Sequence, residues 1–186
     1  MRVTVLRTLL VTTALAVSSV AGVSATGASA AGAAASASKV RAHQWSTQKR
    51  VVTRSPANAP VVTGIRVGHH KNYDRVVVDL VGSAPGYRVR YVKTLRRDPS
   101  DKTVNLLGAY QLRIRLVPAN GHDITTGAST LTTPKRVKWR LDEVRETAVI
   151  GDFEAVFSVG VGVANRTPFR VRTLSSPTRI VVDVHH

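Results

Sequence analysis

Arginine recurs at every second position in three apolar segments of the chain, and this spacing could do binding chemistry. The three pairs are Arg88 and Arg90, Arg113 and Arg115, and Arg170 and Arg172. Because residues two apart share one face of a β-strand, each pair would project from the same side of its strand. Guanidinium groups bind phosphate and carboxylate in a bidentate way, so the pattern predicts a basic surface for anionic groups. The alternative is that these arginines only cover half-exposed strands with their apolar stems.

Histidine and aspartate occur together at two places, which raises the question of metal binding. His69-His70 is followed by Asp74, and His122 is followed by Asp123. Neither spacing matches a helical zinc motif, and adjacent residues on a strand point to opposite faces. A site that used both His69 and His70 would therefore need a loop. We expect no metal site and no cofactor.

The chain lacks the sequence signatures of the common catalytic classes. It contains no cysteine, which excludes a thiol nucleophile and a disulfide. It also has no Gly-x-Ser-x-Gly elbow, Walker loop or dinucleotide fingerprint. Acid-base catalysis by paired carboxylates needs two acids in one cleft. The acidic residues of the β-rich region that could provide such a pair are Asp74, Asp79, Asp152, Glu154 and Asp183. We expect no catalytic residues; a hydrolase of wall polymer with a carboxylate and histidine site is the first alternative.

Residues 1–30 have the composition of a secretory signal peptide. Arg2 and Arg7 accompany an apolar stretch, and Ala28-Ser29-Ala30 has the small-x-small form of a cleavage site. Threonines and serines interrupt the apolar stretch and no stop-transfer pattern follows, so we expect secretion and no integral membrane segment in the mature chain. The 186-residue chain has a formal net charge of +16. A charge of this size attracts polyanions such as wall polymers, anionic lipids and nucleic acid.

Residues 31–60 lack the pattern of a packed element. Alanine and serine dominate residues 31–38, basic residues are frequent in residues 39–54, and Pro56 and Pro60 lie at the end. This composition is typical of a flexible tether. We therefore divide the chain into a signal peptide (1–30), a disordered basic linker (31–60) and one folded domain (61–186).

From Val61 onward, short β-type segments alternate with turn signals. The nine candidates are residues 61–67, 75–81, 87–93, 104–106, 111–117, 144–150, 153–163, 169–174 and 179–184. In the longest of these, Gly160 and Gly162 leave room for a bulge or for the close approach of another backbone. Residues 135–146 fit either a short helix or an irregular strand. The pattern predicts an all-β domain, a β-sandwich or partly open barrel of about eight to nine short strands.

Two near-identical hexapeptides, residues 75–80 and 179–184, bracket this domain. Each has a wholly apolar face, because its basic and acidic residues both fall on the other face. If the two strands paired antiparallel around Val77 and Val181, two opposite charges would meet across the strands twice, as Arg75 with Asp183 and as Asp79 with Arg179. The alternative is that these four residues occupy solvated positions on two similar strands.

Several motifs in this domain resemble those of one known family. They lie at residues 64–70, 73–77, 85–91, 151–154 and 168–184, in the family's order. The sequence resembles the AMIN-like domain of secreted proteins and lipoproteins of actinobacteria, a relative of the AMIN domain. The resemblance implies a small β-sandwich that localises proteins on the envelope through peptidoglycan or other partners, without catalysis. The chain departs from the family in lacking a lipobox cysteine and in its heavy basic load.

The candidate ligand-binding residues follow from these patterns. They are Asp74, Tyr87, Arg88, Arg90, Tyr91, Arg113, Arg115 and Glu154. The acids would attract basic or amide groups, the arginines would attract acidic groups, and the tyrosines would stack on sugars if exposed but belong to the core if buried. We expect a secreted, non-catalytic module that binds peptidoglycan or an anionic wall polymer. A basic binder of nucleic acid or anionic lipid is the second alternative.

Overall fold

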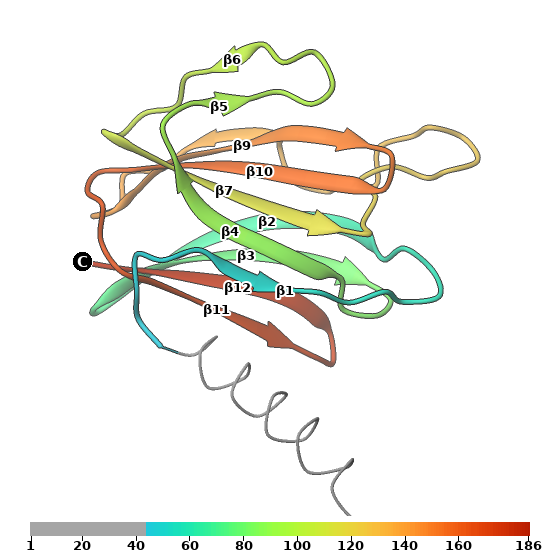
Figure 1. Ribbon diagram of the computed structural model, residues 1–186, viewed down its shortest axis with the longest axis horizontal. Coiled ribbons are helices and arrows are strands. Elements are labelled where there is room, and N and C mark those ends of the chain that lie inside the picture. The colour runs from blue at the N-terminus through green and yellow to red at the C-terminus, as the bar shows by residue number, and fades with distance from the viewer. Residues whose placement is uncertain (1–43) are drawn as a thin grey trace, which may run out of the picture.

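The computed structural model describes residues 44–186, which form an all-β structure without a helix (Figure 1). The strands are β1 (Arg50–Val52), β2 (Val61–His70), β3 (Tyr73–Val81), β4 (Gly86–Val92), β5 (Leu95–Arg96), β6 (Thr103–Val104), β7 (Tyr110–Val117), β8 (Arg136–Lys138), β9 (Val144–Phe153), β10 (Val156–Val163), β11 (Phe169–Leu174) and β12 (Thr178–His185). The predicted fold class is confirmed. Residues 44–186 contain no helix that is long and apolar enough to cross a membrane.

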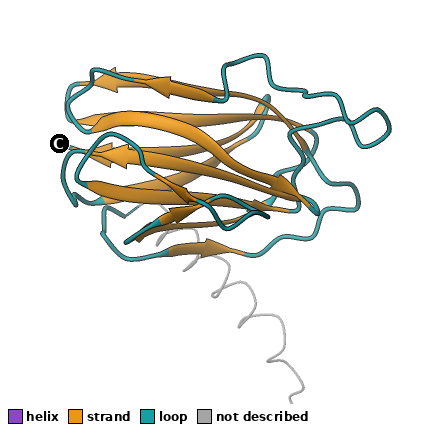
Figure 2. Cartoon of the chain, turned by 90° about the horizontal axis from the view of Figure 1, so that it is seen from above, coloured by secondary structure: helices purple, strands orange, loops and turns teal. Residues whose placement is uncertain are grey.

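Two antiparallel sheets form the sandwich (Figures 1 and 2). One has six strands in the order β1-β4-β7-β10-β9-β8, and the other has four in the order β11-β12-β3-β2. Alternate residues of both sheets fill the space between them, for example Val89 of β4, Ile114 of β7 and Val78 of β3, which are fully buried in one apolar cluster. The period-2 pattern of the sequence therefore decides which side chains enter the core and which lie on the two outer faces.

The small β5–β6 hairpin covers part of the outer face of the six-stranded sheet. Leu95 and Val104 of this hairpin pack with Leu106, Ala148 and Ile150 in a second apolar cluster. Gly160 and Gly162 of β10 permit this contact: a Cβ atom at Gly162 would lie 1.9 Å from the carbonyl oxygen of Leu107. The expected close approach of another backbone is thus confirmed, and β10 also has register shifts at Ser158/Val159 and Gly162/Val163 against β9.

The expected start of the strand over residues 153–163 is wrong, whereas residues 156–163 form β10 as expected. The chain turns at Glu154 and Ala155, which both adopt left-handed backbone angles (φ 49° and 55°), and the two sides pair as β9 and β10. Two left-handed residues are the signature of a tight hairpin turn. The apolar alternation continues across the turn without a glycine or proline at its centre, so the pattern does not indicate a strand end there.

Part of the expected linker belongs to the folded domain. Within residues 44–60, β1 pairs with β4, and the backbone of Ser46 exchanges two hydrogen bonds with Phe169. Trp45 packs edge-on against His185 at 5.0 Å. A three-residue edge strand is too short to show a period in the sequence. The expected signal peptide and the first part of the expected linker lie outside the described residues.

The two hexapeptides pair as expected, in an antiparallel register that places Val77 opposite Val181. Arg75 bonds the opposite carboxylate of Asp183 at 2.6 Å. The second cross-strand ion pair does not form: Asp79 is bonded instead by Arg66 of β2 at 2.6 Å, while Arg179 donates to the backbone carbonyl of Pro177 at 3.2 Å. The reason is that β3 lies between β12 and β2, so arginines on both neighbours can reach Asp79.

Candidate functional site

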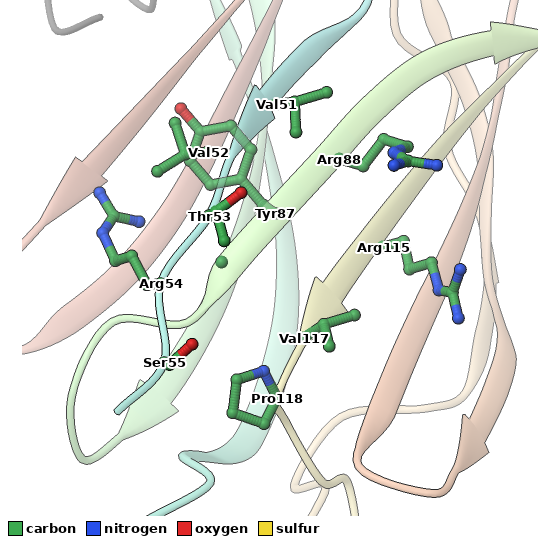
Figure 3. Close-up of a pocket in the computed structure, with 11 residues that line it drawn as sticks. Val51, Val52, Thr53, Arg54, Ser55, Tyr87, Arg88, Arg115, Val117 and Pro118 are labelled. Atoms are coloured by element: carbon green, nitrogen blue, oxygen red, sulfur yellow. The ribbon is translucent and has the colours of Figure 1, made fainter. Parts of the chain in front are cut away.

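Four arginines gather on the outer face of β4 and β7. The antiparallel register sets Arg88 directly opposite Arg115 and Arg90 directly opposite Arg113. Together they line one shallow hollow, and Figure 3 shows Arg88 and Arg115 on neighbouring strands. We call these four residues the arginine face. Their positions follow from the alternation, because Val89, Leu112, Ile114 and Leu116 on the same two strands are buried.

The charge on the arginine face is only partly neutralised within the protein. Arg113 bonds the carboxylate of Asp98 and lies 3.5 Å from the buried hydroxyl of Ser158. In residues 44–186, the guanidinium groups of Arg88, Arg90 and Arg115 have neither an ion pair nor a hydrogen bond, and all three side chains are exposed. Like charges directly opposite one another on a sheet are unfavourable. A bound anion would relieve that repulsion.

The third arginine pair does not join this face. Arg170 and Arg172 lie on β11 of the other sheet, where they bond the carboxylate of Asp183 at 2.9 and 3.0 Å. Together with Arg75, they place three guanidinium groups around one fully buried carboxylate. Burial raises the pKa of Asp183, but the hydrogen bonds from Arg75 and Arg170 outweigh it, and the net pKa lies below the usual value. These arginines are internal counter-ions.

A cleft of about 330 Å³ opens beside the arginine face, between β1 and β7. Arg88 and Arg115 form one side of it (Figure 3). Arg54 lies on the other side, but its guanidinium turns away and donates to the carbonyl of Pro85 at 2.9 Å and to the hydroxyl of Thr173 at 3.2 Å. Apolar and small residues also line the cleft, namely Val51, Gly86, Val117 and Pro118. A volume of this size suits a single sugar or phosphate unit. The sequence does not predict that residues 51–55 line this cleft, because their composition is that of a tether.

The two candidate tyrosines belong to the core. Tyr87 is 4% exposed, and burial raises the pKa of its hydroxyl. Tyr91 is half-buried, donates its hydroxyl proton to the carbonyl of Thr167 at 2.8 Å and packs edge-on against Phe169. Both are on the inner face of β4, opposite to Arg88 and Arg90. Neither ring is therefore free to stack on a sugar.

The two candidate acids lie apart from the arginine face and from each other. The carboxylate of Asp74 is fully buried and accepts hydrogen bonds from the backbone N–H groups of Glu143 and Val144 at 2.7 and 2.9 Å. Glu154 is exposed in the β9–β10 turn. Val144 pairs with the last residue of β10, whereas Glu154 precedes its first residue, so the two acids are at opposite ends of the sandwich.

The fold and the arginine face together define a β-sandwich with exposed arginines, unbonded within residues 44–186, on the outer face of its six-stranded sheet. The family model described as AMIN-like domain matches residues 60–186, more than half of the chain, so the protein belongs to the AMIN-like domain family. No curated protein and no solved structure matches the chain. Family membership indicates a cell-envelope-associated module, and domains of this family are in general non-catalytic binding modules.

Proposed function

We propose that this AMIN-like domain is a secreted, non-catalytic module that binds an anionic wall polymer on the arginine face. The observation that carries the proposal is the pairing of Arg88 with Arg115 and of Arg90 with Arg113 across β4 and β7. Three of these guanidinium groups have no partner among the described residues, although the fold holds them side by side. Phosphate or carboxylate groups spaced along a polymer would provide the missing negative charges.

The cleft beside the arginine face supports a polymer as the ligand. Arg88 and Arg115 line both the cleft and the arginine hollow, so the two surfaces are continuous. A chain molecule could place one unit in the cleft and its neighbouring charged groups along β4 and β7. Residues two apart on a strand are about 6.6 Å apart, which lets successive charged groups meet successive arginines.

The nucleic-acid alternative is less well supported by the side chains around this face. Sequence-independent binding of single strands uses exposed aromatic rings among the basic residues. On β4 the aromatic residues Tyr87 and Tyr91 point to the core. The exposed Tyr110 begins β7 on the side of the buried Leu112, opposite to Arg113, and the exposed Phe153 lies on β9, two strands away from β7. A polymer without bases therefore fits the face better.

The hydrolase alternative has one observation in its favour. Asp142 and Asp74 both come close to His69, at 4.0 and 3.0 Å. However, Asp74 is fully buried, and its second oxygen is held by two backbone N–H groups. Paired-carboxylate catalysis needs two acids that face a substrate. We expect no soluble fragments to be released from peptidoglycan by the protein.

The proposal is tested by co-sedimentation with anionic wall polymer, with peptidoglycan stripped of that polymer, and with DNA, each across a salt series. The variant Arg88→Gln/Arg90→Gln/Arg115→Gln should bind the anionic polymer roughly 10- to 100-fold more weakly, since each exposed charge contributes about 0.5 to 1 kcal/mol. Binding of the unaltered protein should fall as salt rises.

A matched control removes three charges elsewhere. Lys71, Lys138 and Arg140 are exposed and lie on the β2–β3 turn, on β8 and just after β8. The variant Lys71→Gln/Lys138→Gln/Arg140→Gln should retain most of the affinity. Equal losses in the two triple variants would mean that net charge alone attracts the polymer. Retention on DNA only would exclude the proposed function.

A further inference from the structure

Three polar side chains continue the inner-facing rows of β2, β3 and β12 at one end of the sandwich. His69 lies directly opposite Asp74 in the β2–β3 register, and Asp74 lies opposite Val184 in the β3–β12 register. His186 follows Val184 by two residues and therefore shares its face. The apolar rows thus end in two imidazoles and a carboxylate. The arginine face lies on the outside of the other sheet, so the two groups of side chains are separate.

The ligand-type atoms of these side chains lie close together. The Nδ1 atom of His69 is 3.0 Å from Oδ1 of Asp74, and the Nε2 atom of His186 is 3.7 Å from the same oxygen. Asp142, from the loop between β8 and β9, adds a carboxylate oxygen 4.0 Å from Nδ1 of His69. We call His69, Asp74, Asp142 and His186 the His–Asp cluster. In a tetrahedral zinc site with bonds of about 2.0–2.1 Å, ligand atoms are about 3.3 Å apart.

Two features show that the His–Asp cluster is more than an ordinary surface ion pair. The Nε2 atom of His186 is buried and has no hydrogen-bond partner, which is costly for a polar atom. Asp74 is fully buried, and the N–H groups of Glu143 and Val144 fix its Oδ2 atom, which leaves Oδ1 directed at the two histidines. Such outer hydrogen bonds orient carboxylate ligands in metal sites.

We propose that the His–Asp cluster binds one divalent transition-metal ion, with Zn²⁺ as the preferred ion. His69, Asp74 and His186 would be the three primary ligands, and the exposed Asp142 the fourth. Two imidazole nitrogens with carboxylate oxygens form a donor set that suits Zn²⁺ better than Ca²⁺ or Mg²⁺, which prefer oxygen alone.

Binding requires a local adjustment of one ring. The imidazoles of His69 and His186 are parallel to within 6°, with centroids 5.2 Å apart, so they do not yet point to a common centre. His69 is about half exposed and can turn, whereas His186 is more enclosed. The bound ion would replace the hydrogen bond between His69 and Asp74. It would also link the β2–β3 hairpin, the end of β12 and the loop before β9.

This proposal differs from the expectation of no metal site. The two motif histidines do point to opposite faces, as strand geometry requires, because His70 stacks on Tyr73 at 4.6 Å on the outer face. The missing ligands come from His186 and Asp142, which are far from His69 in the sequence. Only the pairing of β3 with β12 brings His186 to this position. The proposal is independent of the function proposed for the arginine face.

The test is a titration of the chelator-treated full chain with Zn²⁺, followed by NMR of the histidine side chains. The chain has 6 histidines, and we expect the imidazole signals of His69 and His186 to shift together and to stop shifting at one equivalent. The signals of His70 and His185 should stay unchanged until excess metal is added. Because the readout is residue-specific, it does not depend on a variant that folds.

Variants give a second measurement by calorimetry. His69→Ala and His186→Ala should each weaken Zn²⁺ binding at least 100-fold, and His70→Ala, on the opposite face of the same strand, should leave it within threefold. The proposal is overturned if Zn²⁺ does not bind, if the shifts occur at His122 instead, or if His70→Ala loses as much affinity as His69→Ala.

Discussion

The carboxylate of Asp183 is the shared hydrogen-bond acceptor of three arginines. Its side chain is fully buried and accepts hydrogen bonds from Arg75, Arg170 and Arg172 at 2.6 to 3.2 Å. Each of these arginines is about one quarter exposed. Replacing the carboxylate would leave three partly buried cations facing one another. Removal of one partner from a buried ion pair is much more damaging than removal of an exposed pair.

We therefore predict that Asp183→Asn lowers the free energy of unfolding by about 2 to 4 kcal/mol. The control is Asp79→Asn, which removes the partner of the largely exposed Arg66 and should cost about 1 kcal/mol or less. Urea denaturation of both variants measures the difference. Equal costs would show that the three-arginine arrangement adds nothing to stability.

The lowered pKa of Asp183 also predicts a pH dependence. The folded state binds this proton less tightly than the unfolded state, in which the pKa is about 3.9. Its contribution is thus complete above about pH 5 and is lost as the pH falls through and below about 4. Denaturation at several pH values should show a shallower decline for Asp183→Asn than for the unaltered protein in this range. Parallel declines would contradict the assignment.

At the scale of elements, β10 depends on glycine to accept the segment that covers it. The space beside Gly162 is filled by the backbone of Leu107. Gly162→Ala should therefore force that backbone away and cost about 2 kcal/mol or more. Gly68→Ala in β2 is the matched control, because no atom lies within 4 Å of its added Cβ, and it should change stability by about 0.5 kcal/mol or less. Thermal unfolding measures both; similar effects would contradict this role of Gly162.

The elements that the sequence predicts are those with long alternation. The register of β3 and β12 was predictable because two matching hexapeptides carry their charges at the same places. In contrast, β1, β5 and β8 have two or three residues each, so no period can be detected, and their order depends on packing against longer strands. The turn between β9 and β10 was expected at the gap between residues 150 and 153, but it lies at Glu154 and Ala155. Its position was not predictable because these residues are neither glycine nor asparagine, which usually mark left-handed turns.

The candidate site was predictable in its residue types and less so in its grouping. The alternation of apolar and polar residues predicts that Arg88, Arg90, Arg113 and Arg115 lie on outer strand faces. They form one surface only because β4 pairs with β7. The same alternation also placed Arg170 and Arg172 outside, yet on the other sheet and beside Asp183. Whether an arginine binds a ligand or an internal acid depends on its cross-strand neighbours, which a single segment does not reveal.

At the scale of the whole molecule, the two outer faces of the sandwich differ in how their charge is balanced. The face of β11, β12 and β3 carries arginines that are bonded to Asp183, and Asp79 of β3 is bonded by Arg66 of β2. The face of β4 and β7 carries three exposed arginines without a partner in the described part of the chain. The exposed guanidinium groups of β4 and β7 are therefore free to meet an anionic surface, whereas those of Arg75, Arg170 and Arg172 already bond Asp183.

The surface that contacts the polymer can be mapped by NMR while an anionic polymer, a short poly(glycerol phosphate), is added to the labelled protein. We predict that the backbone amides of β4 and β7, together with those lining the adjacent cleft, shift most, and that added salt reverses the shifts. The largest shifts on β11 and β12, or none on any strand, would contradict the assignment of the arginine face as the binding surface.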